Sequence, residues 1–316
     1  ADFRISDIEN EIFSNLCSQI IDEVQIIQLN AEIISKIDIF SSLANLAMHN
    51  KYVRPILDEK FGLEIRNGRH PVVEKLILDQ NEFIGNDIFF NNKNFLSIIT
   101  GPNMSGKSTY LRQIGIIVIM AQIGSFVPAN YAKIGLIDQL FTRVGAGDNL
   151  SEGESTFLVE MQETANIINN ATSDSLILLD EIGRGTSTYD GLSIAWAVTE
   201  YIHDKIKAKT LFATHYHELV ELADKLKYAN NFNILVQESS NKSEIVFMRK
   251  IVEGGTDKSY GIYVAQMAGL PNAIIKKAKI YLELLTKNDK KISFDYKKEI
   301  DSIISEIDVD KNDISE

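Results

Sequence analysis

A glycine-rich segment that ends in a lysine and a serine carries the strongest chemical signal in the chain. It runs from Gly101 to Ser108 and fits the pattern G-x-x-x-x-G-K-[ST]. In a phosphate-binding loop of this kind, backbone N–H groups surround phosphate oxygens, the Lys107 ammonium neutralises the β- and γ-phosphates, and the Ser108 hydroxyl binds Mg²⁺. The predicted contact residues are Gly101, Pro102, Asn103, Met104, Ser105, Gly106, Lys107, Ser108 and Thr109. The pattern therefore predicts a site for a nucleoside triphosphate with Mg²⁺.

Two adjacent carboxylates follow an apolar run elsewhere in the chain. The run from Leu176 ends in Asp180, and Glu181 comes next. Side chains alternate along a strand, so adjacent acids point in different directions unless the chain turns. We therefore expect Asp180 on the Mg²⁺ side and Glu181 facing the attacking water as a general base. Alternatively, Glu181 caps the following loop or forms a surface ion pair.

Histidine follows a third apolar run, which extends from Thr210 to Thr214. The first run extends from Phe95 to Thr100, directly before the glycine-rich segment, and all three are predicted to be buried strands. Ligands of α/β folds collect at the carboxyl edge of the sheet, where the end of this strand places His215. We expect His215 to sense or hydrogen-bond a γ-phosphate. His70 and His217 lack such a position and are expected to be structural.

A serine lies at a predicted helix start between the glycine-rich loop and the acidic pair. Ser155 and Thr156 precede a helix-compatible segment, so they could face a phosphate or simply cap the helix. The order of these segments, phosphate loop, serine element, acidic strand and histidine strand, follows that of an ABC-type ATPase. In that class the serine element completes the site of the partner subunit.

Strands and helices must alternate to hold these residues. Helical segments at 107–123 and 191–203 fit between the apolar runs, which predicts an α/β domain with a largely parallel sheet over residues 55–255. A strand through Leu63 and Ile65, followed by a turn, opens the sheet region.

Helical patterns are predicted on both sides of that domain. Apolar residues from Ile5 to Ile34 recur every three or four positions, which indicates a helix of about 45 Å that acts as a lever or packs as a helical hairpin. A second helical stretch ends before Pro55. The predicted organisation is connector helices at 1–54, an ATPase domain at 55–255, a helix-turn-helix element at 256–288 and an acidic mobile tail at 289–316 with a short helix near residue 300.

Composition excludes several classes of protein. The 316 residues carry a net charge of −12, which argues against a nonspecific grip on nucleic acid or an anionic membrane. A single cysteine, Cys17, excludes an internal disulfide and fits a reducing, cytoplasmic compartment, and we expect it to be buried. The chain shows no targeting signal, and its longest apolar run, Ile114 to Ile123, is shorter than the ~20 residues of a membrane span.

Several segments together resemble the ATPase module of the MutS family of DNA mismatch repair proteins, over about residues 61–285. The similar segments are 68–74, 100–104, 106–110, 141–146, 155–157 with 160–161, 180–187 and 213–216. The resemblance implies a cytoplasmic location, associated with the nucleoid if the protein is bacterial, or an organelle or the nucleus if it is eukaryotic.

The resemblance implies roles for further residues and partners. It implies that Phe83, which spacing alone assigns to the core, stacks on adenine, and that Asn103 lies by the phosphates. It implies that Ser155 reaches the γ-phosphate of the neighbouring subunit and that the loop at 183–188 lies along the ATPase dimer interface. It further implies that the helix-turn-helix at 256–288 is a dimerisation element. The implied cofactors are ATP and Mg²⁺. The implied partners are a second copy or a paralogue, a MutL-like repair protein and mismatched double-stranded DNA bound through domains absent from this chain.

Some features depart from the family pattern. Ser105 stands where the family usually has glycine, and Arg249 stands where some members place an aromatic-type ring near the base. No Phe-x-Glu sequence, the mismatch-reading wedge, occurs in the chain. We therefore expect a C-terminal part of a MutS-like protein that hydrolyses ATP but does not recognise a mismatch alone.

Three alternatives remain open. The long first helix is compatible with the ATPase head of an SMC-like protein, although the segments at 68–74 and 141–146 argue against it. A Smr-type MutS relative typically has threonine in place of Ser108 and fits less well. A nucleotide-gated dimerisation module with negligible turnover is the third, and the Asp180–Glu181 pair argues against it.

Overall fold

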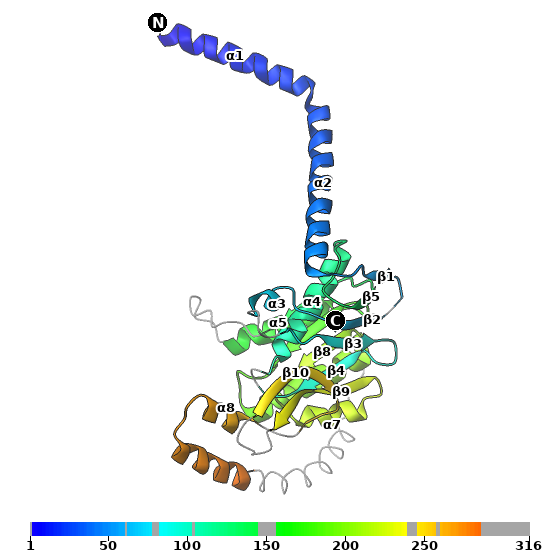
Figure 1. The fold of residues 1–316 in the computed structure, drawn as a ribbon, viewed down its shortest axis with the longest axis vertical. Coiled ribbons are helices and arrows are strands. Elements are labelled where there is room, and N and C mark those ends of the chain that lie inside the picture. Colours follow the sequence, from blue (N-terminus) through cyan, green and yellow to red (C-terminus); the bar gives the residue numbers. More distant parts are fainter. Residues whose placement is uncertain are drawn as a thin grey trace, which may run out of the picture.

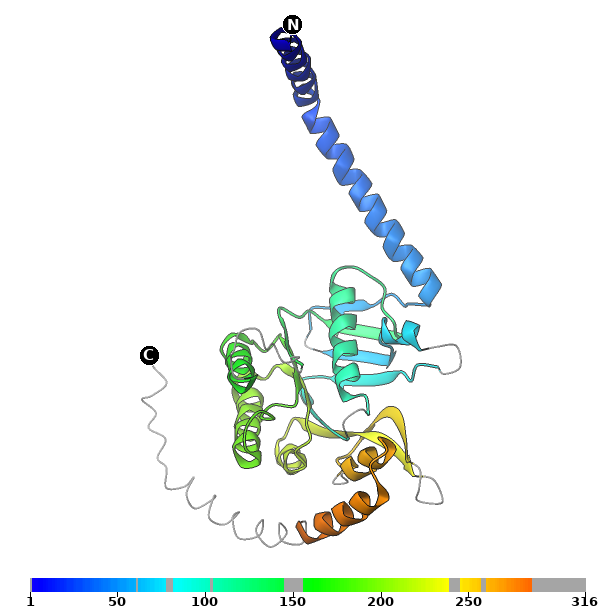
Figure 2. The same ribbon diagram turned by 90° about the vertical axis from the view of Figure 1, so that its left-hand side faces the viewer.

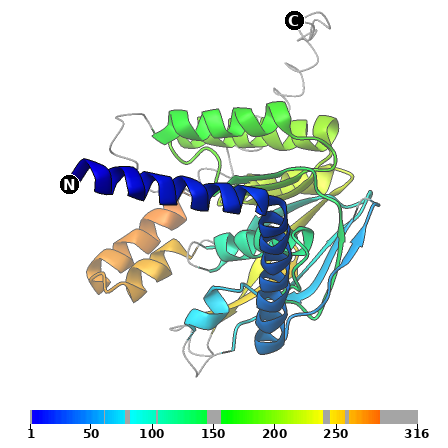
Figure 3. The ribbon, with the colours of Figure 1, turned by 90° about the horizontal axis from the view of Figure 1, so that it is seen from above.

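Two consecutive helices project from the body of the protein in the computed structural model (Figure 1). The structure describes residues 2–60, 62–77, 82–102, 105–144, 156–238, 245–256 and 260–285. Helix α1 (Asp2–Asp22) and helix α2 (Val24–Asn50) meet at a bend, which is plain in the view from above (Figure 3). The backbone leaves helical geometry at Glu23, with φ −102° and ψ 5°.

The helix boundaries predicted for residues 1–54 are wrong. The apolar spacing predicted one helix through Ile34 and a separate second stretch, whereas the break falls at Glu23 and α2 continues to Asn50. Neither glycine nor proline marks the bend, so the periodicity runs through it. Cys17 was expected to be buried and instead is partly exposed on α1.

A six-stranded sheet forms the centre of the body, in the order β10-β9-β4-β8-β7-β6. Its strands are β4 (Leu96–Thr100), β6 (Leu140–Arg143), β7 (Leu176–Asp180), β8 (Lys209–Ala213), β9 (Ala229–Glu238) and β10 (Ile245–Glu253). All neighbouring strands are parallel except β10, which is antiparallel to β9. The three predicted buried strands are confirmed as β4, β8 and β7, side by side, so their carboxyl ends share one edge.

A second, four-stranded sheet was not predicted as a separate unit. It has the order β1-β5-β2-β3, from β1 (Ile56–Asp58), β2 (Leu63–Gly68), β3 (Asn86–Phe90) and β5 (Tyr131–Gly135). The β5–β2 and β2–β3 pairs are antiparallel, and only β1 and β5 run parallel. The prediction of a largely parallel sheet therefore holds for the central sheet, while the fold as a whole has mixed sheets.

Helices cover the two faces of the central sheet. Helix α4 (Lys107–Gln122) packs between the two sheets, while α5 (Thr156–Asn170), α6 (Thr188–Tyr201) and α7 (Glu218–Lys225) share a core on the opposite face (Figure 2). Strand residues alternate between these cores: Ile99 and Leu178 face α4, whereas Ile98 and Leu179 face the other helices. Because both faces are covered, the central strands β4, β7 and β8 are buried along their whole length.

Shorter helical pieces complete the chain. They are α3 (Val73–Leu76), the π-helical turn η1 (Ile202–Ile206), α8 (Gly261–Met267) and a helix at 272–285. Gly269, with φ 89°, lies in the turn between the last two helices. The expected tail and its helix near residue 300 lie outside the described residues. Among the described helices, none is both long and apolar enough to cross a membrane.

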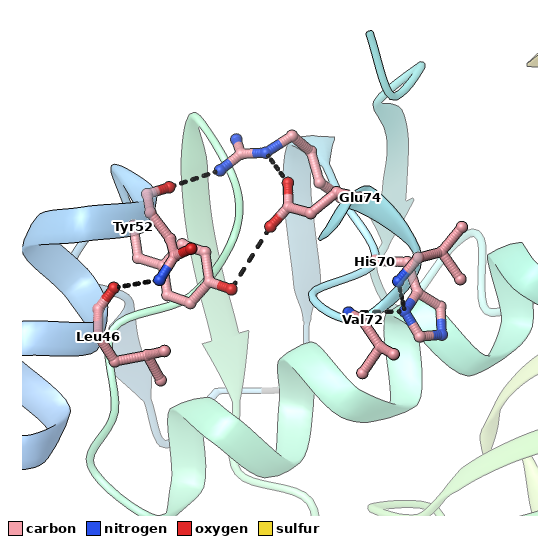
Figure 4. A network of polar contacts seen from close by, with 8 residues as sticks. Leu46, Tyr52, His70, Val72 and Glu74 are labelled. Carbon is pink, nitrogen blue, oxygen red and sulfur yellow. Dashed lines mark hydrogen bonds and ion pairs between the residues drawn. The ribbon is translucent and has the colours of Figure 1, made fainter. Parts of the chain in front are cut away.

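A cluster of polar contacts anchors the end of α2 to the body (Figure 4). Arg69 donates to the Asn50 carbonyl oxygen at 3.2 Å and to the Glu74 carboxylate at 2.7 Å. Tyr52 hydroxyl lies 3.4 Å from the other Glu74 oxygen, and burial together with this carboxylate raises the pKa of Tyr52 to about 12. The segment at 68–74 thus connects α2 to the body.

His70 supports the same segment as a hydrogen-bond acceptor, which confirms its expected structural role. Its Nδ1 accepts from the backbone N–H groups of Val72 and Val73, both at 3.3 Å (Figure 4). Burial lowers the pKa of His70, with Arg112 adding to the effect and Glu74 opposing it. The ring is therefore neutral at neutral pH and can accept both bonds.

Acidification should destabilise the protein through His70. The unfolded chain binds the proton more tightly than the folded chain, so the free energy of unfolding falls as the pH drops through the ordinary value of 6.5. In His70→Gln the amide oxygen can accept the same bonds without titrating. We expect denaturant titrations to show that the stability advantage of the wild type over His70→Gln shrinks between about pH 7.5 and about pH 5.5. A constant difference across this range would contradict the assignment.

Candidate active site

The glycine-rich segment lies where the sequence predicted it, between β4 and α4. Gly106 has φ 110°, a left-handed conformation that favours glycine, and helix α4 begins at the next residue. The first backbone N–H groups of α4 thus stand at the loop, as phosphate binding requires. Thr109 lies half-buried in the first turn.

Ser105 fits the loop, although the resemblance led us to expect glycine at this position. Its backbone does not take up a positive φ, so a side chain costs nothing in conformation. The hydroxyl is fully buried and donates to the Pro102 carbonyl oxygen at 2.6 Å. The substitution therefore closes the loop with an additional hydrogen bond.

Lys107 is buried inside the loop, with 4% of its surface exposed. Its ammonium donates to the carbonyl oxygens of Gly101, at 2.5 Å, and Pro102, at 3.1 Å. Burial lowers the pKa of Lys107, while the negative charges of Glu181 and then Asp180 oppose that shift. The cation therefore lies within electrostatic reach of both predicted carboxylates.

Ser108 and Asp180 come together across the end of the sheet. The Ser108 hydroxyl hydrogen-bonds the Asp180 carboxylate, which lowers the pKa of Asp180 against a larger upward effect of burial. Hydroxyl and carboxylate oxygens are ligands that Mg²⁺ prefers. The two residues predicted from separate motifs to hold Mg²⁺ thus form one oxygen-rich pair that fits the ion.

Glu181 follows β7 at a sharp turn of the chain. Its φ of 57° is left-handed, an arrangement that costs a non-glycine residue about 1 kcal/mol or more and is concentrated at functional sites. Its backbone N–H still donates to the Ala213 carbonyl oxygen, at 2.9 Å. Because the chain turns here, strand alternation does not fix the direction of Glu181 relative to Asp180, and both carboxylates act electrostatically on Lys107.

The ion pair that was considered as an alternative role for Glu181 is also observed. Arg184 Nη1 lies 3.0 Å from Glu181 Oε2, with the arginine side chain 69% exposed and the glutamate side chain 12% exposed. An ion pair with so exposed an arginine contributes little to stability. Glu181 therefore remains a candidate for chemistry.

His215 follows the neighbouring strand β8 and lies at the same edge. The imidazole is exposed and its ring centre is 4.2 Å from that of Tyr216. Partial burial lowers the pKa of His215, and the positive charges of Lys107 and Arg184 lower it further. The negative charge of Glu181 raises the pKa and so opposes these effects. These influences place His215 within reach of the charged groups at the ends of β4 and β7.

His217, expected to be structural, contacts the Thr256 carbonyl oxygen at 2.7 Å.

Phe83 lies half-buried just before β3, rather than in the core as spacing suggested. The side chain of Asn86 connects this region to a bulge in β10: its amide donates to the Arg249 carbonyl oxygen at 3.0 Å and accepts from Ile251 N–H at 2.8 Å. Arg249 sits at that bulge with φ 53° and an exposed side chain. The two sheets are thus joined beside Phe83.

Some predicted site residues lie outside the described residues. They are Asn103, Met104 and Ser155. Helix α5 begins at Thr156, so the structure confirms the helix that Ser155 was expected to precede.

Sequence reasoning assigned no role to a buried network behind Glu181. Glu160 on α5, Arg143 at the end of β6 and Tyr216 after β8 all contact each other or the loop that follows Glu181. The position of Glu160 on the buried face of a helix could have predicted this network, because acidic residues are almost never buried without a partner.

Comparisons with known proteins show which family the chain resembles. The family model described as MutS domain V matches residues 97–286. The DNA mismatch repair protein MutS of Chlorobium chlorochromatii is 55% identical over 285 residues, which cover 90% of this chain and 32% of that protein. MutS of Caldanaerobacter subterraneus is 51% identical over 314 residues, which cover 99% of this chain and 35% of that protein. MutS of Salinibacter ruber is 54% identical over 288 residues, which cover 90% of this chain and 32% of that protein.

The fold and site define an α/β protein with a phosphate-loop motif at one sheet edge. The chain belongs to the MutS family and contains its domain V. It spans about a third of the length of the relatives above.

Proposed function

We propose that this chain binds Mg-ATP at the edge formed by β4, β7 and β8 and hydrolyses it to ADP and phosphate. One observation carries the proposal: the Ser108–Asp180 pair stands beside the buried Lys107, and the Glu181 carboxylate lies within electrostatic reach of both Asp180 and Lys107. The motif predicts a phosphate site, and the paired oxygen ligands and a second carboxylate are what hydrolysis additionally needs.

In the proposed reaction, water attacks the γ-phosphate in line with the leaving oxygen. Glu181 accepts a proton from that water or positions it, and Lys107 neutralises charge on the β- and γ-phosphates. Ser108 and Asp180 would hold Mg²⁺, which would supply positive charge to offset the negative charge of the phosphates. A neutral His215 contacts the γ-phosphate from the end of β8.

Nucleotide recognition beyond the phosphates is assigned by family membership. Phe83 stacks on the adenine, for which its half-buried ring in a loop is suited. Asn103 lies by the phosphates, together with Gly101, Pro102, Met104, Ser105, Gly106 and Thr109.

We propose that two ATPase domains form a dimer around the nucleotide and so control a DNA clamp in mismatch repair. Ser155 of each subunit completes the site of the other, and the loop at 183–188 lies along the interface. The boundaries of the parts are those expected from the sequence: 1–54, 55–255, 256–288 and 289–316, with the helices after Gly255 supporting dimerisation. Mismatched DNA and a MutL-like protein are partners of the longer protein, in the cytoplasm or nucleoid.

Mixing two inactive variants tests the shared site. Lys107→Ala chains supply Ser155 but do not bind nucleotide, whereas Ser155→Ala chains bind nucleotide but supply no serine. Each alone should be inactive. An equal mixture should recover about a quarter of the wild-type ATPase rate, because half of the dimers are mixed and each holds one complete site.

The control for this experiment mixes each variant with itself at the same total concentration. A mixture that stays as inactive as its components would contradict completion of the site by the partner subunit.

A nucleotide-gated dimerisation module is the second candidate function. In that case ATP occupancy would be the signal and turnover would be negligible. The exposed ion pair between Glu181 and Arg184 is the observation that favours it, because it gives Glu181 a role without chemistry.

A further inference from the structure

A buried ion pair lies directly behind the loop that carries Glu181. Glu160 is 3% exposed and Arg143 is 7% exposed. Arg143 Nη2 lies 3.4 Å from Glu160 Oε2, and Arg143 Nε lies 3.0 Å from Glu163 Oε2 at the more exposed side. Burying a carboxylate costs several kcal/mol unless charges and hydrogen bonds compensate it, so Glu160 needs its partners.

The second oxygen of Glu160 holds the loop itself. Glu160 Oε1 accepts a hydrogen bond from the backbone N–H of Gly183, two residues after Glu181. The carbonyl oxygen of Gly183 in turn accepts from the Tyr216 hydroxyl, at 3.0 Å. The backbone N–H and the carbonyl oxygen of Gly183 are thus both hydrogen-bonded to side chains from outside the loop.

Close packing leaves this residue little freedom to move. Gly183 has φ 87°, and a Cβ atom placed on it would lie 2.5 Å from Gly191 Cα at the start of α6. A Cβ on Gly185 would lie 2.9 Å from Phe157 Cβ, in the first turn of α5. Helix α5 therefore touches the loop at two points, through Glu160 and through Phe157.

The network links the start of helix α5 to the loop that follows Glu181. Helix α5 begins at Thr156, immediately after Ser155, and Glu160 lies about one turn further along the helix. Tyr216 also packs against the ring of His215. A displacement of α5 would thus be transmitted through Glu160 to the loop that follows Glu181.

We propose that Glu160 is a positioning residue, which with Arg143 and Tyr216 couples the position of helix α5 to the position of Glu181. The inference rests on the proposed ATPase function, since it assigns Glu160 a part in that reaction. Glu160 acts through Gly183 and does not contact the nucleotide.

Variants at Glu160 and Glu163 form a matched set for testing this inference in the full chain. Glu160→Ala removes the acceptor for Gly183, Glu160→Gln keeps an oxygen that can accept the same bond, and Glu163→Ala removes only the outer partner of Arg143. Tyr216→Phe removes the donor to the Gly183 carbonyl oxygen with little change of volume. Thermal unfolding identifies which variants remain folded.

The first measurement separates kcat from KM for ATP. We expect Glu160→Ala to lower kcat by about 10- to 100-fold, the range for a lost hydrogen bond to a charged group, with KM within about twofold. Glu160→Gln should retain most of kcat, and Glu163→Ala should resemble the wild type. An unchanged kcat in folded Glu160→Ala would overturn the inference, as would equal losses in Glu160→Gln and Glu160→Ala. Should Glu160→Ala fail to fold, Tyr216→Phe decides in its place, with a lower kcat at unchanged KM expected and an unchanged kcat overturning the inference.

The second measurement does not depend on ATP turnover. Arg184 is 69% exposed, and trypsin can cleave after it once the loop opens locally. We expect faster cleavage at Arg184 in Glu160→Ala and in Tyr216→Phe than in the wild type and Glu163→Ala. If the wild type did not hydrolyse ATP, the proposed function would fail while this comparison still decided the positioning of the loop. Equal cleavage in all folded variants would then overturn the inference.

Discussion

Replacing Lys107 with alanine should abolish ATP binding at micromolar nucleotide. The ammonium is the buried cation of the loop and the group predicted to neutralise the β- and γ-phosphates. A hydrogen bond to a charged group is worth about 1.5–3 kcal/mol, so its loss weakens binding by about 10- to 100-fold before the unpaired phosphate charge is counted. Isothermal titration calorimetry with ATP and Mg²⁺ measures this loss.

A control for the loss of positive charge is available on the same protein. Lys133 on β5 is 46% exposed and pairs with Asp58 at 2.9 Å. Lys133→Ala should bind ATP as the wild type does. Thermal unfolding checks that Lys107→Ala is folded, which we expect because the substitution removes a buried charge. ATP binding by folded Lys107→Ala with wild-type affinity would exclude the loop as the phosphate site.

Replacing Glu181 should remove turnover and leave nucleotide binding intact. General base catalysis contributes about 10²- to 10⁴-fold, so Glu181→Ala and Glu181→Gln should lower the steady-state ATPase rate within that range. Binding should persist because the phosphate contacts come from the loop and α4. Both replacements keep the conformational cost of φ 57°, so backbone strain is matched to the wild type.

Arg184 gives the control for the ion pair. Arg184→Ala removes the salt bridge to Glu181 while the carboxylate remains. If Glu181 acts on the water, Arg184→Ala should retain far more activity than Glu181→Ala. Unchanged steady-state hydrolysis in Glu181→Ala would defeat the role assigned to the carboxylate.

The central strands and the site could be predicted because their signals are local. Apolar runs buried on both faces identify β4, β7 and β8, and the glycine-rich loop, the acidic pair and His215 come at the ends of these runs, which places all three at the carboxyl edge. The loop motif fixes the start of α4 at Lys107, as found. The bend at Glu23 has no comparable signal, since the helical periodicity continues through it.

The remaining features depend on contacts between distant segments. The second sheet needs the pairing of β2 with β5, whose residues are far apart in the sequence. The positions of Glu160 and Arg143 behind Gly183 likewise follow from packing α5 against the central sheet. The prediction that Phe83 stacks on adenine came from family similarity, because spacing alone is equally compatible with a core position for an aromatic residue before a strand.

Single-turnover hydrolysis tests the central claim most directly. The wild-type chain, in excess over ATP labelled at the γ-phosphate, is followed for release of phosphate with Mg²⁺ and with the metal chelated. We predict that the bound ATP is converted to ADP and phosphate in the presence of Mg²⁺ and is left intact in its absence. Tight binding of Mg-ATP, with dimer formation but no phosphate release, would contradict the ATPase assignment and support the nucleotide-gated module.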